Sequence, residues 1–198
     1  MARPLAVAIT GGIGAGKSTA LEAFRAHGAA VVSSDAIVHH LLATDDGVRE
    51  AIVAELGDDV LGADGRPDRA SIARAVFADR KRLAWLEQLL HPLVSREYLR
   101  WRDALAALAD PPRVCVTEVP LLYEVGGESR FDKVVLVTAP KKLREARGRV
   151  LTDDRESRLL SDREKAKKAD YVYVNTGTFD DLDDWVAGVL AELSKDVS

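Results

Sequence analysis

The chain has 198 residues, of which 47% are hydrophobic, so it is long enough to bury one sizeable core and to form one α/β domain. Its formal net charge of −4 gives no general case for binding nucleic acid or a membrane surface. The single cysteine, Cys115, excludes an internal disulfide and a cysteine-cluster metal site. We expect a cytoplasmic enzyme, because the N-terminus leads directly into an apolar strand and no apolar run has membrane length.

The first predicted elements are a buried strand over Leu5–Thr10, a glycine-rich segment over Gly11–Thr19 and a helix over Ala20–His27. The segment fits the pattern G-x-x-x-x-G-K-[ST]. Glycines let backbone N–H groups approach phosphate oxygens, and the helix dipole adds partial positive charge at the same place. The alternative is a glycine-rich turn that happens to hold a lysine, but the flanking strand and helix favour phosphate binding.

Two side chains of this loop have predicted roles. Lys17 is expected to reach the β- and γ-phosphates of a nucleotide, and the Ser18 hydroxyl is expected to ligate Mg²⁺. The loop alone does not indicate whether the phosphate is transferred, or to what acceptor.

The second predicted strand, Ala30–Ser33, is followed closely by Asp35. Ligands of open α/β sheets bind beyond the carboxyl ends of the strands, so Asp35 is expected to face the same crevice as the glycine loop. A carboxylate there can accept or orient the proton of an attacking hydroxyl. The alternative is that Asp35 caps a helix beginning at Ala36, and the sequence leaves both interpretations open.

A long stretch before the third strand predicts mainly helices, and in an α/β kinase such an insertion can hold the acceptor substrate. Pro92 is expected to break or restart the last of these helices. The alternation of apolar runs with helical segments favours a parallel sheet covered by helices on both faces. The predicted helices are Gly47–Leu56, Arg69–Ala78 and Lys81–Leu108, and the remaining strands are Arg113–Thr117, Lys133–Thr138 and Tyr171–Val174.

Two acids and one basic segment are further candidates for function. Glu118 occupies a position similar to that of Walker-B acids, which hold Mg²⁺ directly or through water, and Glu124 is placed to contact substrate or arginines. A solvated or salt-bridged role is the alternative for each. The segment Lys141–Lys168 holds eleven Lys or Arg against six acids. It is either a solvated face or a basic lid that brings cations over a transferring phosphoryl group.

Several motifs occur together along the chain, and some are more specific than the glycine loop. They are Thr10–Thr19, Phe24 with Gly28, Asp35, Gly65–Arg69, Phe77, His91-Pro92, Val119–Glu124, Ala169-Asp170 and Asn175–Gly177. In these motifs and in their order, the chain resembles the dephospho-CoA kinase family over nearly its whole length.

The resemblance implies a three-layer P-loop NTPase fold with a five-stranded parallel sheet, a helical acceptor-substrate insertion and a lid. It implies a single kinase domain over 1–198, with its core at about 1–35, 112–140 and 169–198, the insertion at about 36–111 and the lid at about 141–168. The implied activity is transfer of the ATP γ-phosphoryl group to the 3′-hydroxyl of dephospho-CoA, with Mg²⁺. This reaction gives coenzyme A and ADP in the last step of coenzyme A synthesis.

Matched residue by residue, Asp35 is the family's catalytic aspartate, and Asn175 and Gly177 belong to a segment near the adenine. The lid departs from the family pattern, because the arginines of Leu143–Arg149 are spaced differently and no Gln lies near Arg158. Which of Arg144, Arg147 and Arg149 contacts phosphate therefore stays open. The predicted catalytic residues are Asp35, Lys17, Arg144 and Arg147, the metal ligand is Ser18, and the nucleotide-binding residues are Gly12, Gly14, Ala15, Gly16, Lys17, Ser18, Thr19, Asn175 and Gly177.

Two other functions remain open at this stage. One is a different P-loop kinase that acts on a nucleoside or nucleotide, and the other is a nucleotide-dependent switch or weakly catalytic binding homologue. The Asn-Lys-x-Asp motif by which switch GTPases read their base is absent. The expected partner is dephospho-CoA, with neither nucleic acid nor membrane, and the expected state is a monomer or weak homo-oligomer.

Overall fold

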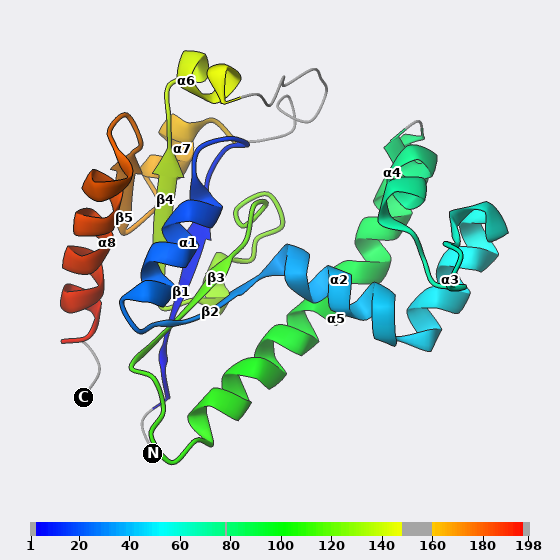
Figure 1. Cartoon of the computed structure of the whole chain (residues 1–198), viewed down its shortest axis with the longest axis horizontal. Coiled ribbons are helices and arrows are strands. Elements are labelled where there is room, and N and C mark those ends of the chain that lie inside the picture. Colours follow the sequence, from blue (N-terminus) through cyan, green and yellow to red (C-terminus); the bar gives the residue numbers. More distant parts are fainter. Residues whose placement is uncertain (1–2, 78, 148–159, 196–198) are drawn as a thin grey trace. The chain divides into compact units, whose positions relative to one another are not determined.

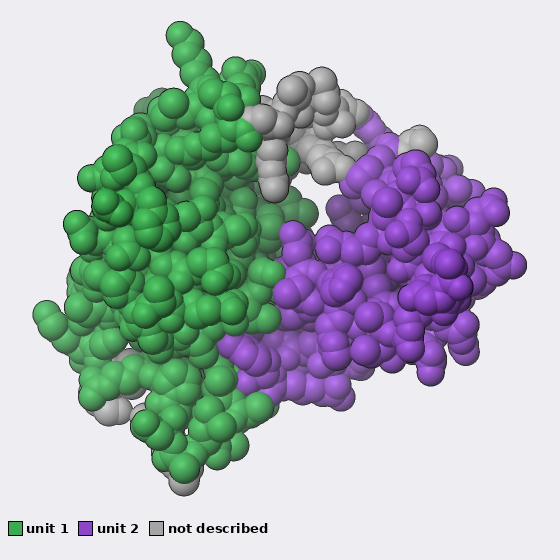
Figure 2. Space-filling model, in the orientation of Figure 1, with its two compact units in different colours: residues 1–33, 102–198 green, residues 34–101 purple. Residues whose placement is uncertain are grey.

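The computed structural model describes residues 3–77, 79–147 and 160–195. The chain divides into two compact units, one formed by Met1–Ser33 with Arg102–Ser198 and the other by Ser34–Trp101 (Figure 2). Residues 148–159 of the expected lid, with Arg149 and Arg158, lie outside the described residues.

The first unit contains the parallel sheet that the apolar runs predicted. Its strands follow the order β2-β3-β1-β4-β5, and all neighbouring strands pair in parallel (Figure 1). Because the strands are parallel, their carboxyl ends meet at one edge, which is where such sheets place their ligands. The strands are β1 Leu5–Thr10, β2 Ala30–Ser33, β3 Val114–Glu118, β4 Lys133–Thr138 and β5 Tyr171–Val174.

Both faces of this sheet are covered, which explains why its strands read as continuous apolar runs. Val7, Ile9 and Val135 belong to the core cluster that also contains side chains of α1 (Lys17–Ala26) and α8 (Phe179–Leu193). On the opposite face, Ala8 and Val134 pack with residues of the segment that follows β3. The shorter elements of this unit are η2 Glu128–Arg130, α6 Lys141–Ala146 and α7 Asp162–Ala166.

Cys115 lies in the middle of β3 and is fully buried. Burial raises the pKa of its thiol to about 11, because an apolar surrounding disfavours the thiolate. A thiol held in its neutral form is a poor nucleophile, so the role of this cysteine is to fill the core.

Helix α1 begins at Lys17, earlier than the expected start at Ala20. Gly16, the residue before it, has φ 102°, a left-handed conformation that favours glycine. This turn brings Lys17 and Ser18 into the first turn of the helix, so both side chains lie at the positive end of the helix dipole.

The second unit is helical and has its own apolar core. Leu42, Val48, Ile52, Ile72 and Leu90 are buried members of that core. Two acids cap its helices, since Asp45 accepts a hydrogen bond from Val48 N at 3.0 Å and Asp68 accepts one from Ser71 N at 2.7 Å. The elements are α2 Ser34–Thr44, α3 Asp46–Leu56, η1 Asp58–Val60, α4 Arg69–Phe77 and α5 Arg80–Ala106, the end of which belongs to the first unit.

The expected helix break at Pro92 is wrong, because α5 runs without interruption from Arg80 to Ala106 with Pro92 inside it. A proline in a helix leaves the carbonyl four residues earlier without its usual donor, and here that residue is Gln88. Pro92 and Gln88 are both exposed, so water can satisfy the free carbonyl. The hydrogen bond that is lost at Gln88 therefore does not end the helix.

Among the helices that the structure describes, none combines the length and the apolar character that a membrane span requires.

Candidate functional site

The glycine loop gathers one cation, one hydroxyl and one carboxylate at the carboxyl edge of the sheet. Lys17 Nζ donates a hydrogen bond to the Gly12 carbonyl at 3.0 Å and lies 4.0 Å from Glu118 Oε1. Ser18 Oγ donates to Glu118 Oε2 at 3.1 Å. The side chains of Lys17 and Glu118 are only 9% and 12% exposed, so their charges interact with little screening by solvent.

The residue types of this cluster fit Mg²⁺. Mg²⁺ prefers oxygen ligands, keeps several of its waters, and in kinases is held by one or two protein oxygens together with phosphate oxygens. Ser18 Oγ and the Glu118 carboxylate supply such oxygens side by side. The described residues hold no group of three or more His, Cys, Asp and Glu arranged as a metal cage.

Asn175, which follows β5, is buried against the glycine loop. Its amide nitrogen donates to the Ala15 carbonyl at 2.9 Å, and a Cβ on Gly16 would overlap this amide. Gly16 is therefore required both by its φ angle and by the close approach of Asn175. The contact explains why Asn175 and the glycine loop belong to one site although they lie far apart in the sequence.

Arg147, at the end of α6, joins the same network. Its guanidinium donates to the Gly14 carbonyl at 3.3 Å, to Asn175 Oδ1 at 3.2 Å and to the Asn175 carbonyl at 3.4 Å. Through these bonds, Arg147 links the loop after β5 to the glycine loop. Arg147 thus acts on the backbone that binds phosphate as well as supplying positive charge.

Arg144 lies over the start of the glycine loop. Its Nη1 is 2.8 Å from the position that a Cβ of Gly12 would occupy, so a larger residue at position 12 would make the guanidinium shift. Asp162 Oδ1 is 3.7 Å from that same position, and the other oxygen of Asp162 accepts a hydrogen bond from Thr138 Oγ1. Arg144, Asp162 and Thr138 therefore gather beside Gly12, at the edge where phosphate is expected.

Asp35 is an exposed residue in the first turn of α2, directly after the carboxyl end of β2. Because α2 begins at Ser34, Asp35 lies inside the helix and not before it, which contradicts the alternative that it caps a helix beginning at Ala36. An exposed carboxylate in this position is free to meet a substrate hydroxyl.

The carboxylate of Glu124 is paired with other residues of the chain. Its Oε1 lies 2.8 Å from Lys165 Nζ and also accepts a hydrogen bond from Leu160 N at 3.0 Å. Lys165 is fully buried, so this pair ties α7 to the segment after β3. The segment after α7 is fixed further by Lys168, whose Nζ lies 5.3 Å from the centre of the Tyr123 ring.

Gly177 precedes the residue that caps α8, and a side chain at this position has no room. A Cβ on Gly177 would overlap the Asp181 carboxylate, which accepts hydrogen bonds from the N and Oγ1 atoms of Thr178. Its expected place near the adenine stays a prediction.

Sequence reasoning missed Asp162 and Thr138. Thr138 ends β4 at the carboxyl edge of the sheet. A polar residue at the end of a predicted strand could have been identified as a candidate, because ligands bind at this edge. Asp162 carries no such signal, because it reaches the loop only through the packing of α7 against β4. The sequence did place Lys17, Ser18, Asn175 and the two arginines, and the structure brings these together around the glycine loop.

Comparison with known proteins gives a consistent result. Residues 5–181 match the family model described as dephospho-CoA kinase. A dephospho-CoA kinase of Thermobifida fusca is 35% identical over 198 residues, covering 96% of this chain and 97% of that protein. One of Frankia casuarinae is 35% identical over 193 residues, covering 94% of this chain and 82% of that protein.

Two solved structures resemble the chain over nearly its full length. The protein TT1252 from Thermus thermophilus is 35% identical, with a TM-score of 0.75 over 96% of this chain and 98% of that one. The dephospho-CoA kinase from Campylobacter jejuni is 25% identical, with a TM-score of 0.67 over 96% of this chain and 97% of that one.

Proposed function

The chain belongs to the dephospho-CoA kinase family, and we propose that it transfers the γ-phosphoryl group of ATP to the 3′-hydroxyl of dephospho-CoA. The products are coenzyme A and ADP, and the reaction is the final step of coenzyme A synthesis. The observation that carries the proposal is the cluster of Lys17, Ser18 and Glu118 on a glycine loop, which Arg144 and Arg147 flank.

In the proposed mechanism, the backbone N–H groups of the glycine loop and Lys17 hold the phosphates of ATP. Lys17 leaves its bond to the Gly12 carbonyl and follows the negative charge that develops on the transferring group. Arg144, which lies over Gly12, supplies further positive charge to the same group. Arg147 keeps the loop in shape through Gly14 and Asn175.

Asp35 is the proposed base. It takes the proton of the 3′-hydroxyl while that oxygen bonds to the γ-phosphorus, and the bond from the γ-phosphorus to the bridging oxygen of ADP breaks. Ser18 and Glu118 are the residues that would hold Mg²⁺, which would neutralise negative charge on the phosphates of the nucleotide.

The acceptor is proposed to bind on the helical unit, whose first turn carries Asp35. Dephospho-CoA is the proposed partner, without nucleic acid or membrane. A cytoplasmic location and a monomeric or weakly oligomeric state also remain predictions.

A direct assay of acceptors tests the proposal. ADP release would be measured with ATP and Mg²⁺ in the presence of dephospho-CoA, of adenosine monophosphate or cytidine monophosphate, or of no acceptor. We expect release to depend on dephospho-CoA and to stay near the acceptor-free level with either monophosphate. Faster release with a nucleoside monophosphate would instead identify a nucleotide kinase, and equal release in every mixture would indicate a binding protein with little transfer.

The position of the new phosphate provides the second readout. Phosphorus NMR of the product should show a phosphomonoester on the ribose 3′-oxygen, and Lys17→Ala should abolish its formation because the loop loses its cation. An unchanged rate in that variant would contradict the assignment of the loop.

A further inference from the structure

The helical unit contains a pocket of about 160 Å³ that the catalytic residues named above do not use. Its walls come from α2, α4 and α5, and nine of its ten lining residues are apolar. Phe77, one of the lining residues, is 54% exposed, so the pocket reaches the surface. An open apolar pocket favours an apolar ligand group, because water inside it forms few hydrogen bonds.

The pocket begins close to the proposed base. Val38 and Leu42 follow Asp35 on α2 by three and seven residues. Residues at these spacings share one face of a helix. Val38 and Leu42 line the pocket. With a rise of 1.5 Å per residue, the pocket wall lies about 5 to 10 Å along the helix from Asp35. All these residues belong to the same unit, so one ligand can contact both Asp35 and the pocket.

The tenth lining residue, Arg69, adds one positive charge to the apolar pocket. It is exposed, and no carboxylate of the described part of the chain forms an ion pair with it. A guanidinium in this setting is suited to a phosphate oxygen of a ligand. The pocket therefore fits a molecule in which an apolar group lies next to a phosphate.

Dephospho-CoA has such a junction. Its diphosphate is joined through one methylene group to the pantoyl carbon, which carries two methyl groups, and a ribose separates the diphosphate from the adenine. The adenine edge carries several nitrogen atoms that require hydrogen-bond partners, and the pocket offers almost none. The chemistry of the pocket thus favours the dimethyl part of the acceptor over its base.

We propose that the pocket of α2, α4 and α5 receives the dimethyl pantoyl group of the acceptor while Arg69 pairs with its diphosphate. The proposal rests on the proposed function, since it takes dephospho-CoA as the acceptor. It gives the helical unit a specificity site that lies beside the base and rejects acceptors without a pantoyl arm.

Two fragments of the acceptor allow its pantoyl end and its base end to be tested separately. 4′-Phosphopantetheine carries the pantoyl group and a phosphate but no base, whereas adenosine carries the base and the 3′-hydroxyl only. Each would be tested as an inhibitor competing with dephospho-CoA. Ala73→Leu fills the pocket with apolar atoms, and Ala54→Leu makes the same change on an exposed face of α3 outside the pocket.

In Ala73→Leu, we expect the KM for dephospho-CoA and the inhibition constant of 4′-phosphopantetheine to rise by roughly tenfold or more, because the methyl groups lose their place. The inhibition constant of adenosine should not change, and Ala54→Leu should behave like the wild type. Arg69→Gln removes an exposed charge without disturbing the core. This variant should weaken inhibition by 4′-phosphopantetheine but leave inhibition by unphosphorylated pantetheine unchanged.

Each other outcome overturns the inference. If Ala73→Leu weakens inhibition by adenosine and leaves inhibition by 4′-phosphopantetheine unchanged, the pocket holds the base. If it changes neither fragment, the pocket takes no part in acceptor binding. These failures are distinct from failure of the proposed function, in which the wild type would show no ADP release that depends on dephospho-CoA.

Discussion

Glu118 is a single carboxylate with two neighbours of different kinds. It accepts a hydrogen bond from the Ser18 hydroxyl and lies at ion-pair distance from the Lys17 ammonium group. A carboxylate placed in this way can orient Ser18 and can also hold water molecules around Mg²⁺. It should therefore affect metal binding more than the binding of the nucleotide itself.

Glu118→Gln keeps the size of the side chain and removes its charge. We expect the Mg²⁺ concentration for half-maximal activity to rise by about tenfold to a hundredfold, which is the usual effect of losing an outer ligand of a metal. Titration of the rate with Mg²⁺ at saturating ATP and dephospho-CoA measures this change.

Glu22→Gln is the control, because Glu22 is an exposed acid on α1 that pairs with Arg25 in the same turn. It should show the Mg²⁺ dependence of the wild type. If Glu118→Gln also shows that dependence, the carboxylate has no role at the metal.

At the scale of residues, the glycine loop was predictable from the sequence because its chemistry depends on neighbours in the chain. Lys17 and Ser18 follow directly from the spacing of the motif. The network of Arg147, Asn175 and Ala15 was not predictable in detail, because it joins segments that only the sheet brings together. The same applies to Asp162, which depends on the packing of α7.

Two helices of the first unit begin with a capping box, in which the third helical residue bonds back to the cap. Ser161 and Glu164 form the box of α7, and Thr178 and Asp181 form that of α8. Hydrogen bonds from Thr178 lower the pKa of Asp181, because they favour the charged carboxylate. The α8 cap lies next to Asn175 in the sequence, so it supports the loop that contacts the phosphate-binding segment.

The lowered pKa of Asp181 sets a direction for the dependence of stability on pH. A carboxyl group with a lower pKa in the folded state stabilises the fold above the pKa of the unfolded chain, about 4. This contribution is lost as the pH falls through the lower pKa of the folded state. Asp181→Asn should therefore reduce the free energy of unfolding at pH 7, and its difference from the wild type should shrink below pH of about 4.

Urea unfolding of both proteins at several pH values measures this difference. Asp180→Asn removes a charge from the same first turn of α8 without touching the capping box, so its effect should be smaller. A constant difference between Asp181→Asn and the wild type at every pH would contradict the electrostatic role of the cap.

At the scale of elements, the strands were predictable because each is a short apolar run between helical segments. The central strands β1, β3 and β4 are buried, whereas the edge strands β2 and β5 are partly exposed. The start of α1 was missed, because a glycine loop carries no helical periodicity up to Gly16. The course of α5 was missed for a different reason. Pro92 removes one hydrogen bond of the helix, and the exposure of Gln88, whose carbonyl loses that bond, is not visible in the sequence.

At the scale of the whole molecule, the residues of the proposed reaction come from two units with separate cores. The first unit provides the glycine loop and its cations, and the second provides Asp35 and the apolar pocket. The alternation of strands and helices predicted the sheet and placed a helical insertion after β2. The pocket was not predictable, since α2, α4 and α5 form it together and none of them shows it alone.

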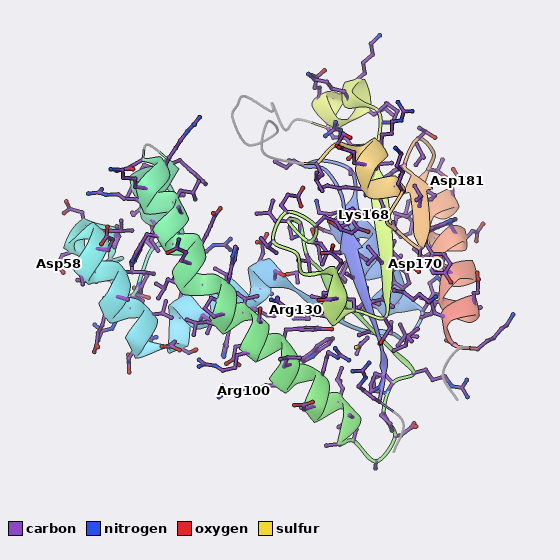
Figure 3. All side chains as sticks on the ribbon, turned by 180° about the vertical axis from the view of Figure 1, so that it is seen from behind. Asp58, Arg100, Arg130, Lys168, Asp170 and Asp181 are labelled. Carbon is purple, nitrogen blue, oxygen red and sulfur yellow. The ribbon has the colours of Figure 1, made fainter. Side chains whose placement is uncertain are left out.

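The central claim is that Asp35 acts on the acceptor hydroxyl while the glycine loop binds ATP, and the most direct test is the rate of ADP release by Asp35→Asn. With dephospho-CoA at saturation, we expect this rate to fall by about 100- to 10,000-fold. ATP affinity should stay close to that of the wild type, because the loop is intact. Asp58→Asn, the same change at an exposed acid of the helical unit (Figure 3), should retain the full rate. A rate near that of the wild type in Asp35→Asn would contradict the claim.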